Sequence, residues 1–207
     1  MILGQIESGT PFGNILYDLC KSKSEIKTVV EIGTWHGMGS TKCLIQGLID
    51  SSKTDLSFIS IEANKKMYDV AVNCWQGILP SWAKLIHGRV VEVTDLDSTN
   101  LGYQHPDEPI WFEEDKNAML SCPNVLADLP SKIDLLFLDG GEYSTHAEFL
   151  KLKDRSSFIL LDDTTARKCK GIREIVLSDT ETYTILFDNT SYRGGVMGFL
   201  NNKCVLP

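Results

Sequence analysis

Four apolar runs in this sequence carry acidic residues at or near their ends. Glu31 lies in KTVVEI, Glu62 ends LSFISIE, and Asp139 ends IDLLFLD. A fourth run, SFILLDD, ends in the pair Asp162 and Asp163. Short continuous runs of Val, Ile, Leu and Phe are typical of strands that are buried on both faces of a parallel sheet. Open α/β sheets bind ligands beyond the carboxyl ends of such strands, so we expect these carboxylates to face a ligand.

A glycine-rich turn follows the first run, in the stretch EIGTWHGMGST. Its glycines allow the backbone to turn tightly and to approach a ligand closely. A dinucleotide fingerprint would read G-x-G-x-x-G and place a pyrophosphate on the following helix, and the spacing here departs from it. The carboxylate before the turn favours a ligand with an ammonium or sulfonium group, because it would repel a phosphate. The candidate cofactor-binding residues in this stretch are Glu31, Gly33, Thr34, Gly37 and Ser40.

The next two strand ends extend the predicted cofactor site. Glu62 can accept hydrogen bonds from both hydroxyls of a ribose, as the acidic residue of nucleotide-binding sheets does. His87 and Gly88 end the third run, AKLIHG, where a small turn leaves room for a purine ring. A nucleoside with a cationic tail fits the three strand ends, and S-adenosylmethionine is such a molecule. The alternative is an ordinary strand-to-helix turn whose glycines serve packing alone.

The order of elements along the chain predicts a doubly wound α/β fold, because strands alternate with helical patterns. The expected strands are Lys27–Ile32, Leu56–Glu62, Ala83–Gly88, Ile133–Asp139 and Ser157–Asp163. Helical patterns follow the first, second and fourth strands, and a helical segment at about 11–23 precedes them. Residues 183–200 read as a hairpin that adds an antiparallel pair at one edge of the sheet.

The segment 95–131 does not fit this alternation. It is rich in Asp, Glu, Asn and Pro, with Tyr103, Trp111 and Phe112 among them. We expect at most short helices here. Because long excursions from compact domains often bind ligands, we predict a lid or insertion that places Trp111 and Phe112 on the substrate side.

Composition narrows the class of protein. The 207 residues suit a single domain spanning 1–207, and a net charge of -8 argues against nucleic acid as a partner. Four Lys and Arg residues between Arg167 and Arg173 are expected to form a solvated face rather than a binding patch. The six cysteines include no C-x-x-C pair, and neither a signal-peptide pattern nor a long apolar run occurs. These features predict a cytoplasmic protein with reduced thiols and no membrane partner.

The stretch EIGTWHGMGST resembles the first motif of Rossmann-like S-adenosylmethionine-dependent methyltransferases. It is most similar to that of metal-dependent O-methyltransferases of the catechol type and of the macrocin (sugar) type. The similarity extends to Glu62, to His87 and Gly88, to the acidic ends of the fourth and fifth strands, and to the terminal hairpin. The resemblance implies a seven-stranded sheet with the strand order 3-2-1-4-5-7-6 and an antiparallel last strand.

In that fold the fourth and fifth strands are neighbours, so Asp139, Asp162 and Asp163 should converge. Three clustered carboxylates repel one another unless a cation lies between them, and oxygen ligands favour Mg²⁺ or Ca²⁺. In the resembling families the matching positions hold Mg²⁺. Consecutive residues of a regular strand point to opposite sides, so both aspartates of the pair can bind one ion only if the strand has ended. Alternatively, Asp163 caps the following turn or helix and Asp139 opens a glycine turn.

The resemblance leaves the identity of the general base open. Related sugar methyltransferases often carry a histidine after the fourth strand and the catechol type a lysine, whereas this chain has Glu142. The candidate catalytic residues are therefore Glu142, His146 and Asp139. Glu142 is alternatively a charge at a helix N-terminus, and His146 a surface residue of that helix.

Together these features predict an S-adenosylmethionine-dependent O-methyltransferase that acts, with Mg²⁺, on a hydroxyl of a sugar or small polyol. The implied partners are a small-molecule substrate and, in a homodimer, a second copy of the chain. Two other classes stay open: a non-catalytic S-adenosylmethionine-binding partner module, and an NAD-dependent dehydrogenase. The missing G-x-G spacing counts against the dehydrogenase.

Overall fold

The structure, a computed structural model, describes residues 6–204, so both ends of the predicted 1–207 domain lie outside the described residues. Its strands are β1 (Thr28–Ile32), β2 (Ser57–Glu62), β3 (Ala83–His87), β4 (Ile133–Leu138), β5 (Ser156–Asp162), β6 (Tyr183–Asn189) and β7 (Val196–Asn201). Its α-helices are α1 (Pro11–Ser22), α2 (Ser40–Ile49), α3 (Lys65–Trp75), α4 (Glu108–Leu120), α5 (Thr145–Leu152) and α6 (Arg167–Ser178). None of these described helices has the length and hydrophobicity that crossing a membrane requires.

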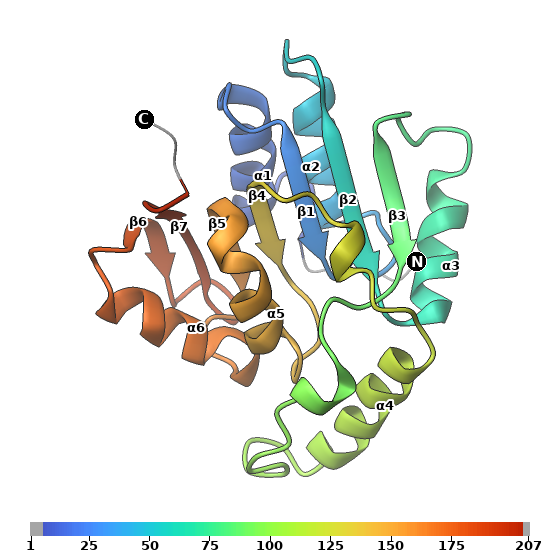
Figure 1. Ribbon diagram of the computed structural model, residues 1–207, viewed down its shortest axis with the longest axis vertical. Helices are drawn as coiled ribbons and strands as arrows, with labels where there is room; N and C mark the ends of the chain where they lie inside the picture. Colours follow the sequence, from blue (N-terminus) through green and yellow to red (C-terminus); the bar gives the residue numbers. More distant parts are fainter. Residues whose placement is uncertain (1–5, 205–207) are drawn as a thin grey trace.

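The strands form one seven-stranded sheet in the order β3-β2-β1-β4-β5-β7-β6 (Figure 1). Strands β1 to β5 are parallel, and β7 is antiparallel to both β5 and β6. The predicted fold class and strand order are therefore confirmed. From β1 the chain adds β2 and β3 on one side of the sheet and then returns to add β4 on the other side. The topological switch point therefore lies between β1 and β4.

Helices cover both faces of the sheet because successive strand residues point to opposite sides. Val30 and Leu136 contribute to a core that includes Phe149 of α5 and Ile172 of α6. Their neighbours along the strands contribute to a second core that includes the inner faces of α1 and α2. In Figure 1, α5 and α6 accordingly lie over one face and α1 and α2 over the other. Burial on both faces explains why the strands read as continuous apolar runs.

The segment 95–131 contains a longer helix than its sequence predicts. Helix α4 has 13 residues, and in Figure 1 it lies beyond the carboxyl ends of the central strands. Only Glu108 and Met119 of this helix are buried, while Ile110 and Trp111 are exposed. Its apolar residues thus do not gather on one side, and without an amphipathic stripe the sequence gives little sign of a helix.

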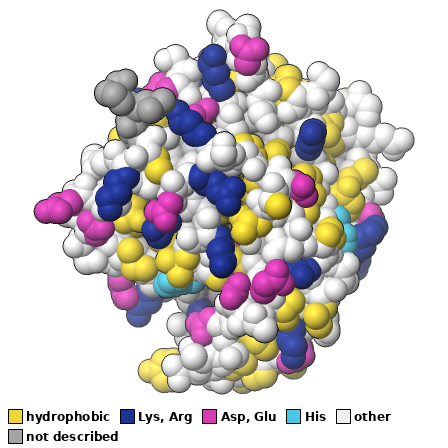
Figure 2. Space-filling model, in the orientation of Figure 1, with side chains coloured by type: hydrophobic (Ala, Val, Ile, Leu, Met, Phe, Trp, Pro, Cys, Tyr) yellow, Lys and Arg dark blue, Asp and Glu magenta, His cyan; other side chains and the backbone are white. Residues whose placement is uncertain are grey.

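The basic run Arg167–Arg173 is not the solvated face that its composition predicts. Lys168 is buried, and Arg167 contacts both Asp97 and Glu108. Arg173 pairs with Asp188 of β6 at 2.6 Å. On the face drawn in Figure 2, the described Lys and Arg side chains are interspersed with acidic and apolar ones rather than gathered together. Arg167, Lys168 and Arg173 therefore make internal contacts, whereas Lys170 is exposed.

Candidate active site

A cavity of about 520 Å³ lies at the carboxyl ends of the strands. It is bounded by the turn after β1 and by the ends of β2, β3, β4 and β5. The predicted site residues that line it are Gly33, Thr34, Ser40, Glu62, Gly88, Asp139, Asp162 and Asp163. The continuous apolar runs of the sequence therefore indicated residues at five strand ends that line one cavity.

The turn after β1 is shaped by two glycines with different roles. Gly33 has φ of 98°, and a Cβ there would clash with the carbonyl oxygen of Asp139. Gly37 has φ of 72° and does not line the cavity. Its carbonyl accepts a hydrogen bond of 2.7 Å from the Trp75 indole N–H. The cofactor contact predicted for Gly37 is thus replaced by packing, while Gly39 lines the cavity instead.

Glu31 lies beneath the cavity and does not line it. Its carboxylate accepts hydrogen bonds from the hydroxyls of Ser40, Thr41 and Ser60 at 2.6–2.7 Å. Burial raises its pKa to about 7, although these hydroxyls oppose the shift. Glu31 therefore does not reach the cavity wall, where a ligand contact was predicted for it. Its hydrogen bonds instead hold the start of α2 against β1 and β2.

Glu62 faces the cavity with part of its hydrogen-bonding capacity still open. One carboxylate oxygen accepts the Trp35 backbone N–H at 2.7 Å, and the other accepts that of Asn64 at 2.8 Å. An ionised carboxylate offers about four lone-pair positions, so two remain for a ligand. Burial raises the pKa of Glu62 to about 7. This geometry suits acceptance of two ligand hydroxyls.

The third strand end contributes its glycine rather than its histidine. Gly88 lines the cavity, and a Cβ there would approach the Val125 side chain within 2.8 Å. His87 points elsewhere: its Nε2 lies 3.1 Å from the Ala63 carbonyl and its ring packs on Tyr68. The structure therefore does not support His87 as a cofactor contact.

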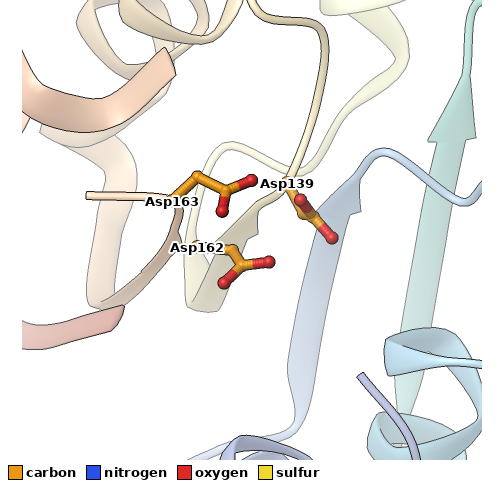
Figure 3. A group of neighbouring side chains, drawn as sticks. All are labelled: Asp139, Asp162 and Asp163. Carbon is orange, nitrogen blue, oxygen red and sulfur yellow. The ribbon is translucent and has the colours of Figure 1, made fainter. Parts of the chain in front are cut away.

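The three aspartates converge as predicted. Carboxylate oxygens of Asp139, Asp162 and Asp163 all lie within 4.8 Å of one another. Figure 3 shows Asp162 and Asp163 pointing from the end of β5 toward Asp139. Strand β5 ends at Asp162, and Asp163 has φ of 55°, so the backbone turns and brings both side chains to one side. Burial and the neighbouring carboxylates raise the pKa of Asp162 to about 7.

Two cationic side chains already lie within this acidic cluster. The Lys168 ammonium is 2.6 Å from Asp139 and 2.9 Å from Asp163. Arg193 is 2.9 Å from Asp162. Both cations line the same cavity. From the sequence, a metal ion was expected to offset the repulsion among the three aspartates. Lys168 and Arg193 already reduce that repulsion.

The two candidate bases after β4 lie in different surroundings. Glu142 lies in an adjoining cavity of about 440 Å³, and its carboxylate accepts the Lys168 backbone N–H at 3.3 Å. Asp115 lines both cavities, and burial together with repulsion from Glu142 raises its pKa to about 6. His146 lines neither cavity and packs against Gly171 of α6. This position does not support His146 as a base.

Sequence reasoning missed Lys168, Arg193, Asp115 and Glu148 as cavity residues. A signal for the first was present, because Lys168, Ile172 and Val176 recur at intervals of four and form one stripe of α6. A lysine on an otherwise apolar stripe indicates an internal partner. Glu148 gave no such signal, yet it is buried and one of its carboxylate oxygens has no partner within the described residues.

Comparison with solved structures shows which known proteins share this fold. No known protein family and no curated protein matches the sequence. Among solved structures, the SAH-bound Podospora anserina methyltransferase PaMTH1 superposes with a TM-score of 0.63 at 15% identity, covering 92% of this chain and 78% of that one. The Bacillus cereus O-methyltransferase in complex with SAH has a TM-score of 0.62 at 17% identity, covering 96% and 84%. A putative O-methyltransferase from Klebsiella pneumoniae gives 0.62 at 17%, covering 97% and 84%. The chain thus has the seven-stranded fold of these methyltransferases.

Proposed function

We propose that the protein transfers the methyl group of S-adenosylmethionine to a hydroxyl oxygen of a small molecule. The observation that carries this proposal is Glu62, which ends β2 and lines the cavity, and whose two carboxylate oxygens each accept one backbone N–H in the described structure. The ribose of the cofactor would donate its two hydroxyls there. The Podospora and Bacillus structures with this fold contain SAH, which supports the same cofactor here.

The rest of the cofactor would follow the strand ends. Gly33, Thr34, Gly39 and Ser40, which line the cavity at the turn after β1, would lie along its amino-acid part. Gly88, which lines the cavity at the end of β3, would face the adenine. Glu31 would support this turn from below.

The acceptor would occupy the adjoining cavity of about 440 Å³. Its walls combine the aromatic rings of Trp111 and Tyr143 with the polar groups of Gln104, Asp115 and Glu142. Flat apolar rings beside hydrogen-bonding groups suit a polyhydroxylated ring or chain, which has both kinds of surface. This composition and the sequence resemblance support a sugar or small polyol as the acceptor.

Transfer would proceed by in-line displacement. The bond between the acceptor oxygen and the methyl carbon forms as the sulfur–methyl bond breaks, and the sulfonium becomes a neutral thioether. The hydroxyl proton would pass to Glu142 or Asp139, the two candidate bases that line the cavities. Most of the rate enhancement would come from holding the hydroxyl oxygen against the methyl group.

Magnesium assistance, which the sequence predicts, meets an obstacle in the acidic cluster. The oxygen donors of Asp139, Asp162 and Asp163 are those that Mg²⁺ prefers, and the ion would lower the pKa of a bound hydroxyl. The Lys168 ammonium, however, already bridges Asp139 and Asp163. An ion at this place would have to displace the ammonium, so the residues as arranged do not accommodate Mg²⁺.

The two other classes receive less support. Dehydrogenases of the dinucleotide-binding type have the strand order 3-2-1-4-5-6, without the antiparallel strand that β7 inserts here. A non-catalytic binding module would not require the second cavity that adjoins the cofactor site. We also propose a cytoplasmic enzyme without nucleic-acid or membrane partners, in which a homodimer is compatible with the site.

A transfer assay tests the proposal. The protein is incubated with S-adenosylmethionine carrying a labelled methyl group and with a panel of sugars, polyols and catechols. Label should appear in at least one polyhydroxylated acceptor. Glu62→Ala should reduce the transfer, whereas Glu181→Ala, which changes an exposed residue away from both cavities, should not. Binding of S-adenosylhomocysteine without transfer to any acceptor would favour the non-catalytic module.

A further inference from the structure

We propose that the Lys168 ammonium takes the place of a divalent cation in the acidic cluster and makes the site independent of metal. Its nitrogen lies 2.6 Å from Asp139 and 2.9 Å from Asp163. These are two of the three carboxylates whose convergence predicts a metal ion. Lys168 is 6% exposed and lines the same cavity, so its charge is applied inside the site rather than at the surface.

The charge balance of the cluster supports this assignment. Asp139, Asp162 and Asp163 supply three negative charges when ionised, and Lys168 and Arg193 supply two positive ones. One negative charge remains, which is too little to hold a divalent ion beside two resident cations. Removing the ammonium would leave the cluster with two net negative charges and would free the oxygens of Asp139 and Asp163.

The position of Lys168 on its helix provides an independent argument. It is the second residue of α6, where the helix dipole and the free backbone N–H groups disfavour a cation. Its side chain also lies on the stripe that continues with the buried Ile172 and Val176. A lysine at such a place loses both solvation and local helix stability, so its stabilisation has to come from the aspartates it contacts.

The ammonium and Asp162 together offer a place for an acceptor hydroxyl. An ammonium has three donors, and within the described residues the two carboxylates take two of them, which leaves one for an acceptor oxygen. Asp162 is 1% exposed, and its Oδ1 has no hydrogen-bond partner in the described part of the chain. Lys168 would thus position the hydroxyl oxygen for transfer. This last step rests on the proposed function, whereas the replacement of the metal does not.

Manganese, which is paramagnetic and takes the oxygen ligands that magnesium takes, is the probe for the test. Electron paramagnetic resonance with MnCl₂ measures bound ion directly, without cofactor or acceptor. The parent protein should bind no Mn²⁺ at the cluster. Lys168→Ala should bind one equivalent and gain thermal stability from Mg²⁺. The control Lys170→Ala, which changes an exposed lysine of the same helix, should behave as the parent does.

The location of any bound ion is checked with a second substitution, because Asp163→Asn in the Lys168→Ala background should abolish the binding. Lys168→Gln is measured in parallel in case the alanine variant does not fold. The inference is overturned if the parent binds Mn²⁺ and Asp163→Asn removes it, or if neither folded Lys168 variant gains a site. Failure of the proposed function would appear separately, as absence of S-adenosylhomocysteine binding to a parent protein that still excludes Mn²⁺.

Discussion

The β1–β2 half and the β4–β5 half of the sheet edge both carry carboxylates, but the surrounding groups stabilise these carboxylates differently. At β1 and β2, Glu31 and Glu62 are surrounded by hydroxyls and backbone N–H groups. At β4 and β5, the aspartates contact the cationic side chains Lys168 and Arg193. Neutral donors orient a carboxylate without cancelling its charge, whereas a cation does cancel it.

This difference indicates what each half can receive. Burial without a cationic partner raises the pKa of both glutamates to about 7, and a ligand with positive charge would relieve that cost. The sulfonium of S-adenosylmethionine is such a ligand. The β4–β5 half needs no external charge, because Lys168 and Arg193 supply it. We therefore expect the first half to respond to cofactor and pH, and the second to loss of its own lysine.

The largest effect is expected from Lys168→Met. Removing one partner of a buried ion pair leaves its carboxylates uncompensated, and we expect a loss of about 3 kcal/mol in the free energy of unfolding. Urea denaturation in the presence of EDTA measures it. Lys170→Met, on the exposed side of α6, should change stability little. Equal effects of the two substitutions would mean that the contacts of Lys168 contribute nothing.

A smaller effect is expected from Glu62→Ala, now on cofactor affinity. Loss of hydrogen bonds to a charged acceptor should weaken binding of S-adenosylhomocysteine by about 1.5–3 kcal/mol. Isothermal titration calorimetry measures the change, with Glu181→Ala as the control. Unchanged affinity would remove Glu62 from the cofactor site.

The pH dependence of both glutamates follows from their raised pKa values. Each pKa is about 7 in the folded chain against an ordinary 4.5, so the folded state keeps protons that the unfolded state releases in between. These groups should therefore lower stability as pH rises from 4.5 to about 7. Affinity for S-adenosylhomocysteine should instead increase through the same upper range, because ionised Glu62 is the better acceptor of ribose hydroxyls.

The substitution Glu62→Gln separates the contributions of the two glutamates to the pH dependence, since it removes the titration of Glu62 and leaves that of Glu31. Calorimetry at a series of pH values should show that the variant has lost the rise in affinity near neutral pH. Persistence of that rise in the variant would assign it to another group.

The smallest effect is expected in the segment 95–131. Arg167 hydrogen-bonds the carbonyls of Thr99 and Asn100, and Phe112 packs on Tyr143, so part of the segment is anchored without ligand. Trp111 is 42% exposed at the acceptor cavity. Hydrogen exchange around Trp111 should slow modestly when cofactor and acceptor are added. Full protection of the segment in the free protein would identify it as scaffold rather than lid.

The sequence predicted which residues lie at the strand ends better than it predicted the hydrogen-bond and ion-pair partners of those residues. Glu62, Asp139, Asp162 and Asp163 were located correctly, because buried parallel strands are continuous apolar runs that end visibly. The partners of Glu31 were not predicted, since Ser40, Thr41 and Ser60 come from two other elements and meet it only in the folded chain.

Two further errors had local causes. Lys168 was missed because a run of basic residues usually marks a solvated surface, although Lys168 shares one stripe of α6 with Ile172. Helix α4 was missed because its apolar side chains are spread around the helix, with Trp111 and Ile110 exposed. In both places tertiary contacts outweigh the local pattern.

Binding of S-adenosylhomocysteine to the unmodified protein tests the central claim most directly. Isothermal titration calorimetry at a pH above the pKa of Glu62 should give one binding site per chain, and a matching thermal shift should confirm that the folded state is the one that binds. NAD, titrated in the same way, should give no signal. The absence of any binding by S-adenosylhomocysteine or S-adenosylmethionine, from a protein that is demonstrably folded, would contradict the account.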